Sequence, residues 1–282
     1  MIRVSSQGEV THFRMARTLL GRPLYWTGAY LIEDLLVDCG PPALAAHFAR
    51  LIEDRPVNGL VLTHHHEDHM GGAAVLGRLR GLRPRIHATG VGLVRDGFLV
   101  ERYRRLTWGT PERVTAEPVG EHVRSRSMHF QVVHTPGHSP DHICLFEPER
   151  GWLFTGDLFL AERLRYLRED EDLQALIESL RTVAQLPLRE VFCAHRGPVR
   201  DGPAALRRKL EVLDDLRGRI QDLLRQGLPQ REIARRAVGR EGLLTWTSSG
   251  RFSARNFVRA VQRSTEEPQR SQSKRSTQRT EE

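Results

Sequence analysis

A dense run of histidines stands at residues 60–72, with the sequence LVLTHHHEDHMGG. His64 and His66 are two positions apart on an extended segment, so their imidazoles point to the same side. Asp68 and His69 follow where the chain turns into a helix, and they offer a second set of ligands displaced from the first. The combination predicts a metal site rather than a solvated polar loop.

Two other residues of the run have the opposite parity. We expect His65 and Glu67 to contact the ligands from behind or to face solvent, rather than to bind metal. Gly71 and Gly72 remove side chains where the following helix must begin close to the site. The run therefore offers ligands at alternate positions only.

The run alone does not complete a catalytic site, because a catalytic zinc ordinarily uses three protein ligands and an exchangeable water. Three more candidates each follow an apolar, strand-like stretch. His138 stands in HTPGHSPDH, Asp157 in FTGD and His195 in VFCAHRGP. Ligands at strand ends are held on rigid elements, as a well-ordered site requires.

Strand-like and helical patterns alternate along the part of the chain that carries these residues. In the first half, two strands around a turn at Glu33 and Asp34 are predicted within 29–40, further strands at 59–63 and 85–89, and helices at 42–54 and 71–80. After a partly helical excursion over 90–127, strands are predicted at 128–135, 142–147, 151–157 and 190–195, with a helix at about 171–186. This order predicts a layered α/β architecture.

The character of the chain changes after residue 202. Residues 1–202 form the predicted catalytic domain, and residues 203–264 are predicted as a helical, winged-helix-like module. Within it, QREIARRA indicates either a DNA-reading helix or an amphipathic helix that packs Ile233 and Ala234 on the main domain. Residues 265–282 have no aromatic or aliphatic side chain, so we expect a disordered tail.

The formal net charge of +8 comes entirely from this C-terminal part. Residues 1–202 carry 25 basic and 25 acidic side chains, whereas residues 203–282 carry 18 basic and 10 acidic ones. Only two of the 43 basic residues are lysines, Lys209 and Lys274, which indicates coding bias. A basic surface for nucleic acid on the module stays open as an alternative.

Composition also bounds the compartment. The three cysteines, Cys39, Cys144 and Cys193, stand singly, which fits small core residues in a reducing environment. The N-terminal sequence lacks the apolar core of a signal peptide, and no apolar run reaches the length of a membrane span. We expect a cytoplasmic protein without a membrane partner, and its oligomeric state stays open.

The order His-x-His-x-Asp-His, then His in TPGH, Asp in TGD and His in AH-x-G, resembles the metallo-β-lactamase superfamily over about residues 10–200. The resemblance implies a four-layer αβ/βα sandwich with two metal ions at one edge of the paired sheets. It assigns His64, His66 and His138 to the first ion, Asp68, His69 and His195 to the second, and Asp157 to a bridge between them.

This ligand set implies metal-dependent hydrolysis. Two nearby divalent ions lower the pKa of a shared water, so that hydroxide is available near neutral pH. We expect this bridging hydroxide to attack the substrate without a covalent enzyme intermediate, with Asp68 as the catalytic residue that orients it. Zinc is the expected metal, and iron and manganese also suit histidine and carboxylate ligands.

Within the superfamily the chain resembles the glyoxalase II (hydroxyacylglutathione hydrolase) group, whose members carry a C-terminal helical module. That resemblance implies a small thioester or ester as substrate. The segment after Asp157 lacks the Gly-Cys-Gly pattern of glyoxalase II, so the resemblance leaves the recognition of glutathione open. Candidate substrate-binding residues are Arg163, Arg165, Tyr166, Arg168, Arg251 and Arg255. Tyr25 and Trp26 are candidates for the groove wall.

Two other members of the superfamily fit the same ligands. An endoribonuclease-like phosphodiesterase would bind RNA with the basic C-terminal module, and its activity would fall steeply with salt. A persulfide dioxygenase would use a single iron. The sequence therefore indicates a reaction class and leaves the substrate open.

Overall fold

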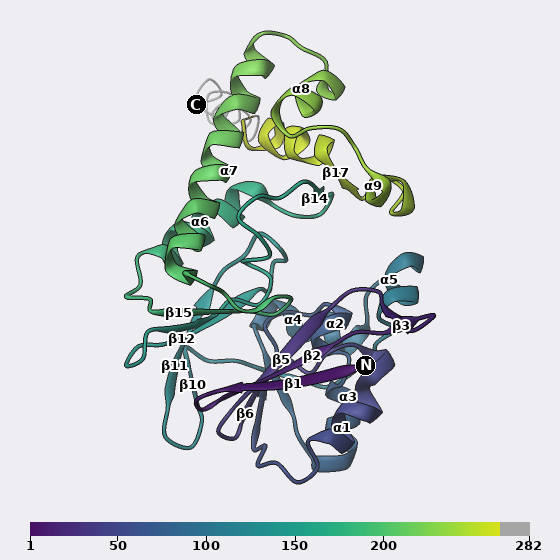
Figure 1. Cartoon of the computed structure of the whole chain (residues 1–282), viewed down its shortest axis with the longest axis vertical. Helices are drawn as coiled ribbons and strands as arrows, with labels where there is room; N and C mark the ends of the chain where they lie inside the picture. Colours follow the sequence, from purple (N-terminus) through teal and green to yellow (C-terminus); the bar gives the residue numbers. More distant parts are fainter. Residues whose placement is uncertain (266–282) are drawn as a thin grey trace, which may run out of the picture.

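The computed structural model describes residues 1–265. Two β-sheets pack face to face, and helices cover the outer face of each sheet (Figure 1). This is the four-layer αβ/βα sandwich that the resemblance implied. The predicted tail, apart from its first residue, lies outside the described residues.

The first sheet runs β1 (Ile2–Gln7), β2 (Val10–Met15), β5 (Thr27–Ile32), β6 (Leu35–Val37), β7 (Gly59–Val61), β8 (Pro84–Ile86) and β9 (Glu117–Pro118) in spatial order. The second runs β10 (His122–Arg124), β11 (His129–His134), β12 (Ile143–Glu147), β13 (Trp152–Phe154), β15 (Glu190–Cys193) and β16 (Gly197–Pro198). The helices of this part are η1 (Pro42–Leu44), α1 (Ala45–Leu51), α2 (Glu67–Met70), α3 (Ala73–Arg80), α4 (Ala88–Asp96), α5 (Arg102–Thr107) and α6 (Leu173–Ala184).

Strand β5 shows why the sheets stack in this way. All six of its residues are buried, and its side chains alternate between two apolar clusters. Tyr30 and Ile32 pack between the two sheets, whereas Ala29 and Leu31 pack beneath α1 and α3. Successive side chains of a strand point to opposite faces, so a continuous apolar run produces a strand covered on both sides.

The C-terminal part is helical, with one short strand. It contains α7 (Gly202–Arg225), α8 (Gln230–Ala237), α9 (Leu243–Thr247), β17 (Phe252–Ser253) and a helix over 254–265. Ile233 and Ala234 of α8 are buried in the same apolar cluster as Leu153 and Val191 of the second sheet. Helix α8 packs mainly against α7 of the same module, so it is amphipathic as predicted but does not lie directly on the sheets.

The hairpin of β1 and β2 was not predicted, and neither were two short strand pairs. Strands β3 (Thr18–Leu19) and β4 (Arg22–Pro23) form a hairpin before β5. Strand β14 (Leu167–Arg168) pairs antiparallel with β17 of the C-terminal part. The Asn256 side chain donates hydrogen bonds to the carbonyls of Leu167 and Arg251, at 2.9 and 2.8 Å, and so holds this pair together.

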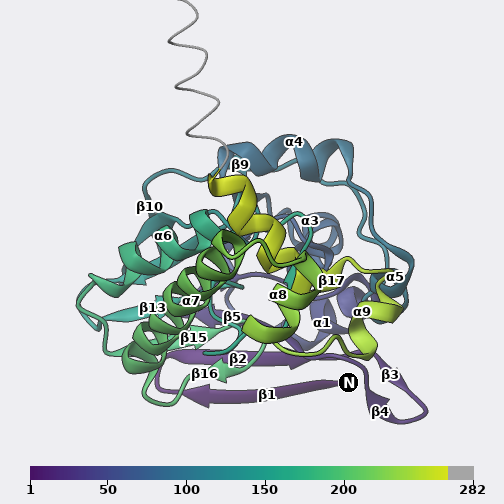
Figure 2. The same ribbon diagram turned by 90° about the horizontal axis from the view of Figure 1, so that it is seen from above.

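Seen from above, the helices of the C-terminal part lie across the rest of the molecule, and β17 projects near α5 (Figure 2). The rings of Tyr103 on α5 and Phe252 on β17 pack edge-on, with centroids 6.4 Å apart, so these two distant parts of the sequence are in contact. Over residues 1–265, no helix is both long enough and apolar enough to span a membrane.

Candidate metal centre

Seven histidine and aspartate side chains converge where four strands end. The run at 64–69 follows β7, His138 follows β11, Asp157 follows β13 and His195 follows β15. Strands β13 and β15 are parallel neighbours, with Phe154 opposite Phe192, so the residues that follow them emerge at the same edge. The structure thus brings together all seven predicted ligands.

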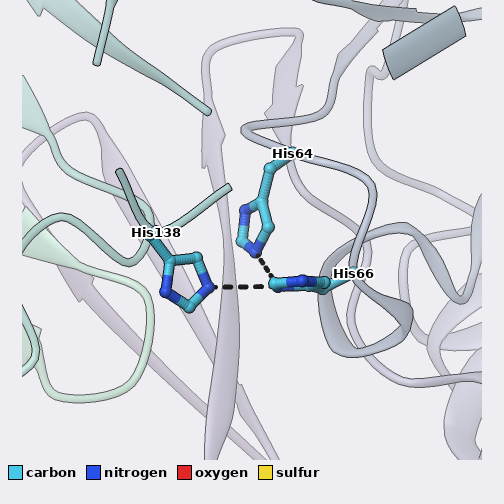
Figure 3. Close-up of side chains that lie close together, drawn as sticks. All are labelled: His64, His66 and His138. Carbon is cyan, nitrogen blue, oxygen red and sulfur yellow. Dashed lines mark hydrogen bonds between the residues drawn. The ribbon is translucent and has the colours of Figure 1, made fainter. Parts of the chain in front are cut away.

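The first ligand group consists of His64, His66 and His138, whose rings face one another (Figure 3). Nδ1 of His66 lies 2.8 Å from Nε2 of His64 and 3.0 Å from Nε2 of His138. All three side chains are buried. Three imidazole nitrogens directed at one another in this way suit a divalent cation between them.

The second ligand group consists of Asp68, His69 and His195. Oδ2 of Asp68 lies 3.6 Å from Nε2 of His69 and 3.5 Å from Nε2 of His195. Asp68 and His69 come from α2, directly after the histidines of the first group. Helix α2 begins directly after His66, so the ligands of the second group lie next to those of the first.

Asp157 lies between the two groups. Its Oδ1 is 3.0 Å from Nε2 of His195 and 3.4 Å from Nε2 of His69, both of the second group. Its Oδ2 is 3.3 Å from Nε2 of His138, in the first group. A carboxylate with one oxygen toward each group has the arrangement that a bridging ligand needs.

Unpartnered atoms test whether these residues fit metal ions. Nε2 of His69 and Oδ1 of Asp157 are buried and have no hydrogen-bond partner among the described residues. Buried polar atoms are nearly always paired, so two such atoms a few ångströms apart indicate a missing cationic partner. Imidazole and carboxylate donors suit zinc, iron or manganese. The site fits two divalent ions.

The outer nitrogens of three ligands are held by hydrogen-bond acceptors. Nδ1 of His69 lies 2.8 Å from Oδ2 of Asp38, and Nδ1 of His138 lies 2.6 Å from Oε1 of Glu171. Nδ1 of His195 donates to the carbonyl of Trp26 at 2.6 Å. A proton on each Nδ1 leaves a lone pair on Nε2, the nitrogen that faces the site.

His66 has the reverse arrangement. Its Nδ1 faces the first group, and its Nε2 lies 2.8 Å from Nη2 of Arg168. Arg168 is buried and also pairs with Asp170. One of the ligands therefore has a cation, rather than an acceptor, behind it.

His65, Glu67 and His142 lie behind the ligands. His65 pairs with Asp141 at 2.8 Å, and Glu67 accepts a hydrogen bond from Arg104 at 2.6 Å. The backbone N–H of Asp157 donates to Nε2 of His142 at 3.0 Å. None of the three belongs to a ligand group in the described part of the chain.

The electrostatics of the site follow from burial opposed by charge. Burial alone would raise the pKa of Asp157, but the imidazoles of His195, His69 and His138 outweigh it and hold that pKa well below its usual range. For His64, burial dominates and lowers the pKa well below its usual range. For His69 and His195, burial would lower the pKa, but nearby carboxylates, Asp157 foremost, outweigh it and raise the pKa. The site thus holds an ionised Asp157 and a neutral His64, both forms that bind metal, whereas His69 and His195 release protons when metal binds.

The predicted substrate-binding residues divide into two sets. Arg163 and Arg165 are exposed on the segment after Asp157 and have no ion-pair partner among the described residues. The other four are engaged in protein contacts: Tyr166 against Gly242, Arg168 with His66 and Asp170, Arg251 with Glu101 and Glu169, and Arg255 with Glu241. Arg163 and Arg165 therefore remain as candidates for contact with a ligand.

Sequence reasoning missed several residues that position the ligands. Glu171 and the carbonyl of Trp26 orient His138 and His195, and Arg104 contacts Glu67 behind the motif helix. Glu171 lies just before α6. Acidic residues are common near the start of a helix, so its position in the sequence did not indicate a role at the metal centre. A backbone carbonyl gives no signal in a sequence.

Comparison with protein families matches residues 29–195 to the family described as the metallo-beta-lactamase superfamily. A hydroxyacylglutathione hydrolase of Legionella pneumophila (strain Corby) is 34% identical over 164 residues, which cover 57% of each chain. The chain therefore spans less than two thirds of the length of this curated relative.

Two solved structures are similar in fold. A metallo-beta-lactamase family protein of Thermus thermophilus, TTHA1429, matches 90% of this chain and 92% of its own, with a TM-score of 0.63 and 21% identity. A protein named TTHA1623, solved in a di-iron-bound form, is 28% identical over 67% of this chain and 96% of its own, with a TM-score of 0.55.

Proposed function

The chain belongs to the metallo-β-lactamase superfamily, and from this premise we propose that it is a metal-dependent hydrolase of a small thioester or ester, similar to glyoxalase II. The observation that carries the proposal is the position of Asp157, with one carboxylate oxygen toward each ligand group. The similarity to a hydroxyacylglutathione hydrolase supports a thioester, because an acyl group on glutathione is attached through sulfur.

Two divalent ions are the proposed cofactor. His64, His66 and His138 would hold the first, Asp68, His69 and His195 the second, and Asp157 would contact both. When bound, such a pair supplies Lewis acidity and makes water a nucleophile near neutral pH. Zinc is our first choice, and the di-iron form of a structural relative supports iron as the alternative.

Asp68 is the proposed catalytic residue. Its Oδ2 points toward His69 and His195, at the edge of the second group, and its Oδ1 points toward Arg104. A carboxylate in this position accepts a hydrogen bond from the attacking water and fixes its direction. In this mechanism the attacking oxygen comes from water, so no covalent intermediate with a side chain forms.

Tyr25 stands at the mouth of the site. Its ring packs edge-on against His195, with ring centroids 5.3 Å apart, and half of the residue is exposed. Burial, followed by the charges of Asp157 and Asp68, raises the pKa of Tyr25 to about 12. The hydroxyl therefore keeps its proton at neutral pH and can donate a hydrogen bond to a substrate or leaving group.

Exposed apolar side chains next to Tyr25 support a substrate with an organic acyl group. Leu19, Leu20 and Leu24 of the β3–β4 hairpin are 56%, 96% and 37% exposed. Some arginines of the C-terminal module pair with acidic neighbours, as Arg217 does with Asp214 at 2.9 Å, whereas Arg231 and others are exposed and have no ion pair among the described residues. The exposed leucines favour a small acyl substrate, and the unpaired arginines keep RNA as the alternative to be tested.

Metal analysis and a substrate screen test this function together. Purified protein is stripped with chelator, reloaded with zinc or iron, and assayed on thioesters, oxygen esters, an RNA and a persulfide. We expect about two ions per chain and thioester turnover that depends weakly on salt. RNA cleavage that falls steeply with salt would replace this function with the endoribonuclease. Persulfide oxidation by a chain with one iron would replace it with the dioxygenase.

A further inference from the structure

A buried ion pair lies directly behind the second ligand group. Nε of Arg104 lies 2.6 Å from Oε1 of Glu67, with side chains that are 8% and 0% exposed. Glu67 precedes Asp68 on α2, whereas Arg104 comes from α5, far along the sequence. Charged side chains rarely become this buried unless each has a partner, so the pair fixes α5 against the helix that carries the ligands.

The same arginine faces Asp68. Its Nη2 lies 3.7 Å from Oδ1 of Asp68, while Oδ2 of Asp68 faces His69 and His195. The guanidinium is planar and charged at all relevant pH values, so its direction is fixed once Nε is bound to Glu67. It attracts one oxygen of Asp68 and thereby turns the other toward the second group.

The charges continue from Arg104 into the C-terminal module. Nε of Arg104 lies 3.9 Å from Oε2 of Glu101, and Oε1 of Glu101 lies 3.1 Å from Nη1 of Arg251. Arg251, just before β17, also pairs with Glu169 at 2.7 Å. The rings of Tyr103 on α5 and Phe252 on β17 pack edge-on, with centroids 6.4 Å apart, and so connect α5 with the module as well. An unbroken series of opposite charges thus links Asp68 to the module.

We propose that Arg104 is the positioning residue for Asp68 and that the C-terminal module acts on the second ligand group through Glu101 and Arg251. This assigns the module a role in completing the metal centre, in place of a surface for nucleic acid. The inference rests on the proposed function only in taking Asp68 as a ligand. A measurement of metal binding in the absence of substrate therefore tests the inference.

Three variants separate positioning from folding. Removing Arg104 alone would leave the charge of Glu67 buried and unpaired, so the main variant is the double substitution Glu67→Gln with Arg104→Met, which removes both charges at similar volume. Arg251→Gln breaks the link to the module. Arg236→Gln is the matched control. Arg236 pairs with a glutamate as Arg251 does, but its partner, Glu232, lies on the same helix, α8.

Zinc titration against a chelating dye gives the affinity of each of the two sites. We expect the double variant to keep one tight zinc ion and to bind the second about 10- to 100-fold more weakly. Arg251→Gln should weaken the second ion by a smaller factor, and Arg236→Gln should leave both affinities as they are. In the thioester assay, kcat should fall with the second zinc while KM stays within about twofold of the wild-type value.

Equal weakening of both zinc ions in the double variant would show a merely structural role and overturn the inference. Wild-type affinities in the double variant would overturn it as well. If Arg251→Gln behaves like the Arg236→Gln control, the link to the module is refuted. If the wild-type chain binds two zinc ions and the second depends on Arg104, but no thioester is hydrolysed, then the proposed function fails and this inference stands.

Discussion

Nη2 of Arg168 lies 2.8 Å from Nε2 of His66, on the side of the ring that faces away from His64 and His138. A guanidinium only donates hydrogen bonds, so this contact needs a lone pair on Nε2 and places the proton of a neutral His66 on Nδ1. A metal ion on Nδ1 needs the opposite tautomer. Arg168 and a metal ion on Nδ1 therefore stabilise different tautomers of neutral His66.

Replacing Arg168 with methionine should raise the affinity of the first ligand group for zinc by about fivefold, if the lost hydrogen bond is worth ~1 kcal/mol. Zinc titration against a chelating dye measures this change. Arg165→Met is the control, since Arg165 is exposed in the same segment. A lower affinity in Arg168→Met would show instead that the arginine holds His66 in place.

Asp157→Asn keeps the size of the side chain and removes its charge. Because Asp157 faces both groups, we expect the metal content to fall from about two ions to about one and kcat to fall by about a thousandfold, or ~4 kcal/mol. Metal analysis and the thioester assay check this. Two tightly held ions in the variant would refute the bridging role.

Tyr25→Phe distinguishes substrates by their leaving groups. A thiolate leaves without protonation, whereas an alkoxide gains from a hydrogen-bond donor. We expect kcat/KM for an oxygen ester to fall by about tenfold and that for the matching thioester to change much less. An equal loss for both substrates would assign Tyr25 to binding the acyl group. No loss for either would remove Tyr25 from the site.

Glu33 gives a prediction about stability and pH that is independent of metal. Burial raises its pKa, but the hydrogen bonds from Ser125 and Ser127, at 2.6 and 2.8 Å, together outweigh burial and lower the pKa to about 2 from an ordinary 4.5. A pKa lowered by folding stabilises the folded state above the unfolded value, and this stabilisation is lost as the pH falls toward 2.

Glu33→Gln should therefore lower the free energy of unfolding by about 1 kcal/mol at pH 7, a modest figure because the side chain is partly exposed. The difference from wild type should shrink between about pH 4.5 and pH 2. Urea unfolding of metal-free protein at several pH values measures it. A difference that stays constant down to pH 2 would contradict the assignment.

The candidate ligands and the alternation of strands and helices were predictable from the sequence because both leave short-range signals. The four-layer sandwich and the division of the ligands between two ions were implied by the resemblance to the metallo-β-lactamase superfamily. His64 and His66 are close in sequence, and the strands before Asp157 and His195 are apolar runs with buried side chains on both faces. The strand before His138 is less regular, since only Phe130 of its six residues is buried. The predicted strand at 190–195, for example, corresponds to β15 (Glu190–Cys193). A strand that is buried on both faces appears in the sequence as a continuous apolar run.

The supporting contacts were not predictable for the opposite reason. Arg104 meets Glu67 only because α5 folds back on α2, and Arg251 meets Glu101 across 150 positions of sequence. Arginines that bind substrate and arginines that pair within the protein are the same residue type, so Arg168 and Arg251 looked like ligand-binding candidates. Strand pairs of two residues, such as β14 with β17, have no detectable period.

The pairing of β14 with β17 also imposes an order of assembly. The Asn256 side chain that secures this pair reaches back 89 positions to Leu167, next to the arginine behind His66. During synthesis the sheets and all seven ligands emerge before residue 252, so the sandwich can form while the last strand is still absent. The nascent chain would acquire its metal-binding residues first and the contact between β14 and β17 last. Premature termination before β17 would remove this contact and would also take Phe257 and Val258 out of the core cluster that covers the second sheet.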